Sequence, residues 1–186
     1  CDWFPEDNWR AGVLGMRGTI PPSFGLMKMH SEEIMDLLRQ AGVADQPVGV
    51  DLAETAMMFE LQNAGMKIVD GQQIMLAARE IKNIDEIVLL NQAAAMVDGV
   101  YHMIYEELKP GVRENDIVAK ANKMLYEMGS DDVEAINAIS GERCNPHPHN
   151  FTDRLLRPGD QAFFDILQSY QGYRTCYYRT FNVGRA

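Results

Sequence analysis

Apolar and polar residues follow two different periods along the chain, which predicts a mixture of helices and strands. In one long segment the apolar positions recur about every 3.6 residues, the pattern of an amphipathic helix. The repeating positions are Ile87, Leu90, Ala94, Val97, Tyr101, Ile104 and Leu108. We therefore expect a helix over residues 84–109, capped by Asn83 and terminated by Pro110-Gly111.

Shorter segments of both kinds surround this helix. We expect further helices over residues 31–41, 52–63, 72–80 and 114–128, and strands over residues 48–50, 66–69 and 133–139. Ser31 is the expected N-cap of the first helix, and Asp51 with Glu54 forms a capping box for the second. The alternation of short strands and helices predicts an α/β layer with parallel pairing. Residues 1–30 follow neither period and are expected to be irregular.

Two aromatic segments near the C-terminus predict a β-hairpin. The segments Phe163–Leu167 and Tyr173–Phe181 are rich in aromatic and β-branched residues, and only a few residues separate them. With Tyr170-Gln171 at the centre of the turn, Asp165 would lie directly opposite Cys176 on one face of the sheet.

Asp165 is the most informative residue of the hairpin, because it is a lone carboxylate in an apolar strand. The burial of a carboxylate without a partner is costly, so Asp165 should be paired, solvated or bound to a ligand. In the same register Arg174 lies diagonal to Asp165 on the same face.

Composition excludes several classes of protein. Of the 186 residues, 46% are hydrophobic and 24% are charged, an ordinary balance for a soluble globular protein. The net charge of −10 argues against a nucleic-acid binder, which needs a basic face. No apolar run approaches the roughly 20 residues that span a membrane. The three cysteines, Cys1, Cys144 and Cys176, form no CxxC motif, which favours a reducing, cytoplasmic setting over a disulfide framework.

Motifs in the C-terminal part resemble one known family. Gly159-Asp160, the Asp of the following strand, Gly172-Tyr173 and Arg179-Thr180-Phe181 resemble the first metal hairpin of the pita-bread family. That family comprises methionine aminopeptidase, Xaa-Pro aminopeptidase, prolidase and creatinase, together with a dimethylsulfoniopropionate lyase. The segment 140–146, Ser-Gly-x-Arg-x-Asn-Pro, is most similar to the creatinase-like and lyase-like branches.

The resemblance also implies how the chain is organised. The order of short helix, long helix, Lys109-Pro110-Gly111 and helix is similar to the junction between a smaller N-terminal domain and the catalytic domain of that family. It implies an α/β (α+β) chain in which residues 1–80 are the C-terminal part of a creatinase-type N-terminal domain. Residues 81–186 would be the first part of a pita-bread catalytic domain. Because the chain begins with Cys1 and stops just after a strand, we expect a middle segment of a longer polypeptide.

The resemblance also assigns roles to individual residues. In the metalloenzymes of the family the hairpin supplies two bridging Asp ligands. Asp165 matches the first, whereas Cys176 occupies the position of the second. His147 matches a His that binds substrate or shuttles a proton. The remaining family ligands, a His and two Glu, would lie beyond Ala186.

The absence of the second Asp favours the creatinase-like branch of the family, whose members hydrolyse a C–N bond without metal. A two-metal centre needs bridging carboxylates, and a thiolate selects softer metals than a carboxylate site does. We therefore expect a creatinase-like or Xaa-Pro-peptidase-like hydrolase of a C–N bond, with His147 as general base. Asp165, Arg174 and His149 would bind a small polar substrate or a short peptide.

Three alternatives remain open from the sequence. The first is a metal-dependent Xaa-Pro aminopeptidase or dipeptidase, with Asp165 binding manganese, zinc, iron or cobalt. The second is a dimethylsulfoniopropionate-type lyase, and the third is a non-catalytic pita-bread binding module. The resemblance to the creatinase-like branch implies a homodimer, and the net charge of −10 argues against a nucleic-acid or membrane partner.

Overall fold

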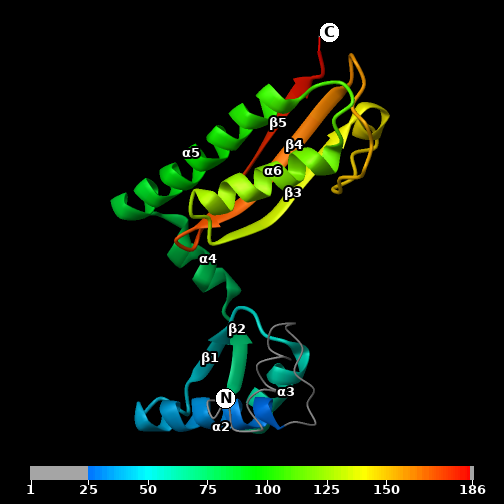
Figure 1. Cartoon of the computed structure of the whole chain (residues 1–186). Coiled ribbons are helices and arrows are strands. Elements are labelled where there is room, and N and C mark those ends of the chain that lie inside the picture. The colour runs from blue at the N-terminus through cyan, green and yellow to red at the C-terminus, as the bar shows by residue number, and fades with distance from the viewer. Residues whose placement is uncertain (1–24, 185–186) are drawn as a thin grey trace, which may run out of the picture. The chain divides into compact units, whose positions relative to one another are not determined.

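The computed structural model describes residues 25–184, and the chain divides into two compact units, Cys1–Ile81 and Lys82–Ala186. Elements of the first unit are α2 (Leu26–Gln40), β1 (Pro47–Val50), α3 (Thr55–Asn63), β2 (Lys67–Asp70) and α4 (Gln72–Glu80) (Figure 1). Strands β1 and β2 pair in parallel, with Val48 opposite Ile68. A small core of Met35, Leu61 and Met66 lies between helices and strands, so the expected α/β layer is present.

Two of the three helix starts expected in the first unit are wrong, and that of α4 at Gln72 is confirmed. Helix α2 begins at Leu26, so residues 26–30 are helical rather than irregular, and residues 1–24 lie outside the described part of the chain. Ser31 is buried within α2 and donates a hydrogen bond to the carbonyl of Lys28 at 2.8 Å. Helix α3 begins only at Thr55, because the backbone of Glu54 is extended, with ψ of 146°. The predicted capping box is therefore absent from α3.

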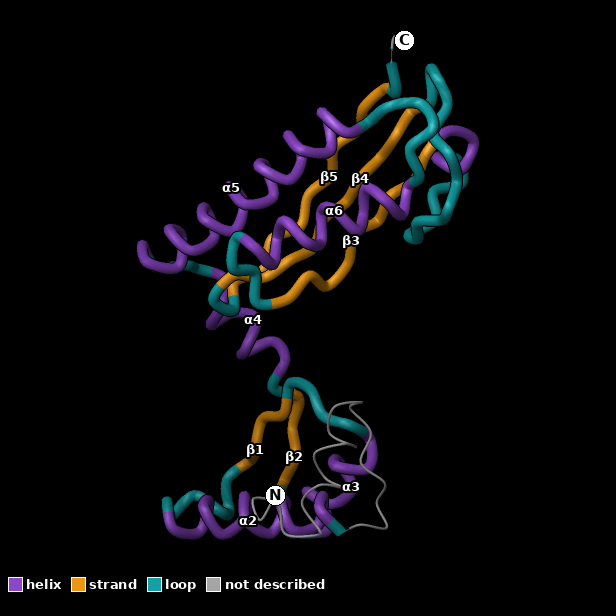
Figure 2. The backbone as a smooth tube through the Cα atoms, viewed as in Figure 1, coloured by secondary structure: helices purple, strands orange, loops and turns teal. Residues whose placement is uncertain are grey.

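The second unit is an antiparallel sheet with two helices on one face. Its elements are α5 (Ile84–Glu107), α6 (Glu114–Glu127), β3 (Asp132–Ser140), η2 (Gly141–Cys144), β4 (Gln161–Tyr170) and β5 (Tyr173–Asn182). The strand order is β3-β4-β5, and Figure 2 shows α5 and α6 on the same side of this sheet. The opposite face of the sheet carries no helix among the described residues.

Helix α5 begins as the sequence predicts. Asn83 Oδ1 accepts from the Glu86 N–H at 2.9 Å, while Glu86 Oε2 accepts from the Asn83 N–H at 2.7 Å, a complete capping box. By length and composition alone α5 could cross a membrane. However, one side of it packs as core against the sheet through Val97, Val100, Tyr101 and Ile104. Ile87, expected on that side, is 42% exposed.

The two faces of β4 have different surroundings. Phe164 and Ile166 belong to the core that α5 and α6 cover, so Phe163 and Asp165 point to the opposite face. Tyr101 fixes the helical layer to the sheet, because its hydroxyl lies 2.6 Å from the Tyr177 carbonyl and 3.1 Å from the Phe164 carbonyl. Burial is the main cause that raises the pKa of Tyr101 above its ordinary range, so the hydroxyl keeps its proton.

The hairpin has a different register from the predicted one. Gln171 and Gly172 form the turn, with φ of 51° and 78°, and Tyr170 pairs with Tyr173. Two-residue hairpins favour positive φ at both central positions, which Gly adopts at little cost. The turn centre therefore lies one residue further on than predicted, and each residue's partner moves by two positions. Because the shift is even, every side chain keeps its predicted face.

Candidate active site

Asp165 is only 4% exposed and lies in a hydrogen-bonded cluster on the sheet face that lacks helices. Its directly opposite partner in β5 is Tyr178, not Cys176 as predicted. Cys176 is a diagonal neighbour whose thiol donates to Asp165 Oδ1 at 3.3 Å. On the other side, Asn137 of β3 donates through Nδ2 to Asp165 Oδ2 at 3.1 Å. We call Asn137, Asp165 and Cys176 the Asp165 cluster.

The thiol of Cys176 stays protonated at neutral pH. Partial burial of the sulfur, the hydrogen bond to Asp165 and the negative charges of Asp165 and Glu134 all raise its pKa. The residue as a whole is exposed, so we attribute most of this effect to the neighbouring carboxylate. In this state the thiol is a hydrogen-bond donor and not a nucleophile.

Arg174 does not accompany Asp165, which corrects the prediction. It pairs with Ser169 in the sheet, and its Nε lies 2.6 Å from Glu134 Oε1. Glu134 lies within the register shift of β3 between Asp132 and Ala135, where strand alternation gives no guide to side-chain direction. Within residues 25–184, Asp165 forms no ion pair with Arg174 or with any other cationic side chain.

The loop between β3 and β4, residues 141–160, brings His147 to the face of Asp165; we call it the His147 loop. The centroid of the His147 ring lies 4.2 Å from that of Phe163, in an edge-on arrangement of 89°. Phe163 also contacts Tyr178, at 5.3 Å between centroids, and Tyr178 is the strand partner of Asp165. His149 lies 5.4 Å from His147. The structure thus gathers both histidines and Asp165 about one face.

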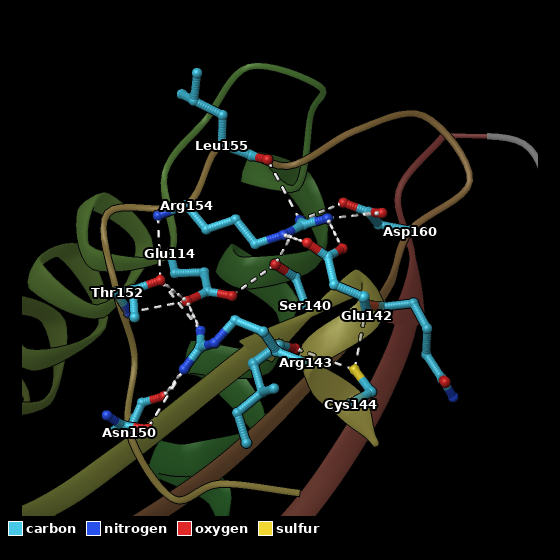
Figure 3. A network of polar contacts seen from close by, with 12 residues as sticks. Glu114, Ser140, Glu142, Arg143, Cys144, Asn150, Thr152, Arg154, Leu155 and Asp160 are labelled. Atoms are coloured by element: carbon cyan, nitrogen blue, oxygen red, sulfur yellow. Dashed lines mark hydrogen bonds and ion pairs between the residues drawn. The ribbon is translucent and has the colours of Figure 1, made fainter. Parts of the chain in front are cut away.

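Glu114, in the first turn of α6, ties the start of the His147 loop to Thr152, on the returning part of the loop (Figure 3). The residue is 1% exposed, and its carboxylate accepts from Ser140 Oγ at 2.6 Å and from Arg143 Nη1 at 2.5 Å. It also accepts from the N–H and the hydroxyl of Thr152, at 2.8 and 2.9 Å. We call Glu114, Ser140, Arg143 and Thr152 the Glu114 clamp. Sequence reasoning missed it, because a Glu that follows Pro110-Gly111 looks like an ordinary helix-start residue.

A second ion pair closes the base of the same loop. Arg154 Nη1 lies 2.5 Å from Asp160 Oδ2 and 2.9 Å from Ser140 Oγ. Arg154 Nη2 also lies 2.7 Å from Glu142 Oε2 (Figure 3). The hydrogen bond from Arg154 is the main cause that lowers the pKa of Asp160.

The lowered pKa of Asp160 predicts a pH dependence of stability. A carboxyl with a lower pKa in the folded state stabilises the fold above its unfolded pKa, about 3.9, and loses that contribution as pH falls through the folded value. Asp160→Asn should therefore be less stable than wild type at neutral pH, and the gap should close in acid below about pH 4. Urea unfolding across pH measures this difference. Asp153→Asn, at an exposed carboxylate of the same loop, is the control; an equal gap at every pH would contradict the prediction.

Comparison with known proteins identifies the family. A model of metallopeptidase family M24 matches residues 88–186, which is just over half of the chain. The chain belongs to metallopeptidase family M24. This confirms the family that the hairpin motifs suggested.

The relatives of this M24 chain include peptidases and another hydrolase. The probable dipeptidase PepE of Mycobacterium tuberculosis is 32% identical over 130 residues, covering 68% of this chain and 34% of the relative. Ectoine hydrolase of Halomonas elongata is 23% identical over 191 residues, covering 97% of this chain and 41% of the relative. The first curated relatives are all longer, and the chain spans only 34% to 42% of their length.

Solved structures show the fold. The Xaa-Pro dipeptidase from Bacillus anthracis matches with a TM-score of 0.73 at 23% identity, covering 83% of this chain and 44% of that chain. The fold of the M24 chain is thus that of the pita-bread proteins, of which it contains a part.

The family name implies a metal, but the residues of this hairpin do not fit a dinuclear centre. Asp165 is the one carboxylate of the Asp165 cluster, and it lies beside a thiol. A dinuclear centre needs bridging carboxylates. The position of the second bridging carboxylate holds Cys176, and a sulfur ligand suits hard ions poorly.

Proposed function

We propose that the protein is a hydrolase that cleaves a C–N bond of a small polar substrate without a dinuclear metal centre. In this proposal His147 is the general base. The observation that carries it is the Asp165 cluster, in which the thiol of Cys176, and not a second carboxylate, lies beside Asp165. M24 membership supports the reaction class, and the substrate and the independence from metal are the parts we propose.

Asp165 has acceptor capacity to spare for a substrate. An ionised carboxylate offers about four lone-pair sites, of which Asn137 and Cys176 use two. The remaining sites can accept N–H groups of a substrate. A carboxylate without a cationic partner among the described residues also favours a substrate that carries positive charge near the scissile bond.

His147 is suited to proton transfer. It is exposed, and its edge contact with Phe163 places it over the same face as Asp165. A neutral imidazole can take a proton from the attacking water as the water oxygen bonds to the carbon of the C–N bond. The same proton then passes to the leaving nitrogen as the C–N bond breaks. His149, adjacent to His147, would contact the substrate.

A metal-dependent Xaa-Pro dipeptidase is the second candidate. The probable dipeptidase PepE, at 32% identity, favours it, and a dipeptidase also cleaves a C–N bond. The two candidates differ in whether the hairpin of β4 and β5 must bind metal ions. The expected homodimer and cytoplasmic location remain predictions under either candidate.

Metal removal separates the two candidates. The full-length protein would be assayed with Ala-Pro, creatine and ectoine, before and after dialysis against EDTA. We expect hydrolysis of at least one of these substrates to continue unchanged after dialysis, because no step needs a bound ion. Activity that disappears and returns with Mn²⁺ or Co²⁺ would establish the metal-dependent dipeptidase instead. Loss of dimethyl sulfide from dimethylsulfoniopropionate, tested in parallel, would identify a lyase.

Cys176→Asp is the matched variant for this assay, because it restores the second carboxylate of the family hairpin. We expect it to bind more Mn²⁺ than wild type, measured as metal content after dialysis against the ion. Equal metal content in the two proteins, with wild type already loaded, would contradict the metal-free hairpin.

A further inference from the structure

We propose that Glu114 is a positioning residue, which ties the start of the His147 loop to Thr152 and thereby holds the imidazole of His147 against Phe163. The catalytic consequence rests on the proposed function, in which His147 is the general base. The positional claim is independent of it, since it concerns where the ring lies.

One carboxylate joins three points of the segment 140–152, which lies 26 to 38 positions further along the chain. Ser140 ends β3, Arg143 lies in η2, and Thr152 lies on the segment that returns towards β4. All three donate to Glu114. The departure and the return of the loop are therefore held together at the first turn of α6 (Figure 3).

The returning segment is also bound to the start of α6 through the backbone. The N–H of Glu114 donates to the carbonyl of Arg154 at 3.1 Å, and the N–H of Asn115 donates to that of Thr152 at 3.1 Å. The N–H of Leu156 donates to the carbonyl of Val112 at 2.8 Å. These hydrogen bonds therefore fix the backbone of the returning segment from Thr152 onwards.

Arg143 extends this fixed region towards the histidines. Its Nη2 donates to the carbonyl of Asn150 at 2.8 Å, while its Nη1 is held by Glu114. Only residues 144–149 lie between these two anchors, and they include His147 and His149. Arg143 thus limits the positions that the His147 imidazole can take, and the orientation of Arg143 depends on Glu114.

The charge of Glu114 is what this arrangement needs. An ionised carboxylate accepts only, and here it accepts four hydrogen bonds from three residues. The amide of a glutamine has the same shape, but its NH₂ group would face either Ser140 or the donors of Arg143 and Thr152. Glu114→Gln therefore keeps the volume of the side chain and removes part of the clamp.

The contact between His147 and Phe163 provides the measurement. An imidazole whose ring centroid lies 4.2 Å from that of a phenyl ring, at 89° to it, has proton chemical shifts displaced by the ring current. In the full-length protein with ¹³C-labelled histidine, His147→Gln assigns the signal, and Phe163→Leu defines the full displacement. We expect Glu114→Gln to move the His147 signal most of the way towards its position in Phe163→Leu. We also expect kcat to fall by about 10²-fold with little change in KM, because the catalytic group is misplaced.

Glu107→Gln is the matched control. It makes the same chemical change at an exposed ion pair, in which Glu107 lies 2.6 Å from Lys120, and it should leave the His147 signal in place. A folded Glu114→Gln protein with the wild-type His147 signal would overturn the proposal. A displaced signal with unchanged kcat would uphold the positioning role and refute His147 as general base. If Glu114→Gln does not fold, Arg143→Lys, which loses the bridge to Asn150, must displace the signal for the proposal to stand.

Discussion

Alanine in place of His147 is expected to lower kcat of the full-length protein by about 10²–10⁴-fold, the contribution of a positioned general acid–base group. KM should change little, because the imidazole acts on water in this mechanism and Asp165 accepts the substrate's N–H groups. The acidic limb of the pH profile of kcat/KM, which reports the essential base of the free enzyme, should disappear as well. Steady-state kinetics across pH, on whichever of the assayed substrates is hydrolysed, measure both effects.

His102→Ala is the control for this variant. His102 is exposed on α5 and lies outside the proposed site, so the same substitution should leave kcat and the pH profile unchanged. Full activity and an unaltered pH profile in His147→Ala would show that another group is the base. The neighbouring His149 would then be the residue to replace next.

The two buried carboxylates of the second unit show why burial alone does not identify a functional residue. Glu114 accepts four hydrogen bonds from the His147 loop and Ser140, one at Oε1 and three at Oε2. Asp165 accepts two. The first is complete as a structural link, whereas the second can still bind a ligand. From this difference in the number of hydrogen bonds we infer that Glu114 holds the loop and that Asp165 binds the substrate.

Local patterns predicted the elements of the fold well. The period of α5, the capping residue Asn83 and the two segments of the hairpin depend on residues close together in the sequence, and the structure has each of them. The predicted register of the hairpin was wrong, because the turn lies one residue further on and several turns fit the segment 168–172. Only the positive φ at Gln171 and Gly172 decides among them. The helix starts near Ser31 and Asp51 failed because the preceding backbone, not the capping residue, decides where a helix begins.

The site was predicted only in part, since its contacts join distant segments. Asp165 stood out as a carboxylate in an apolar strand, and His147 and Cys176 followed from family spacing. Asn137 could not be found, because a single polar residue in β3 gives no sign that it faces Asp165, 28 positions away. Arg174 was misplaced because its partner Glu134 lies at an irregularity in β3. The Glu114 clamp depends in the same way on pairings between three separate elements.

Gly141→Ala is expected to destabilise the protein by roughly 2.5–5 kcal/mol. Gly141 has a φ of +59°, where an L side chain costs about 1–2 kcal/mol. A Cβ atom at this position would overlap the guanidinium of Arg154 and lie 2.8 Å from Asp160 Oδ1. Arg154 would have to leave Asp160, and a hydrogen bond to a charged group contributes about 1.5–3 kcal/mol. Urea unfolding of the full-length protein measures the sum.

Gly159→Ala separates the two contributions, because Gly159 also has positive φ, +81°, but no heavy atom lies within 4 Å of the position that its Cβ would take. It should cost only the backbone contribution, about 1–2 kcal/mol. The excess for Gly141→Ala then measures the displaced ion pair, and it should shrink in the Asp160→Asn background, where that pair is already broken. Equal losses at the two glycines would show that Arg154 finds another position at no cost. The base of the His147 loop would then be adaptable, and the hold on His147 would rest on Glu114 alone.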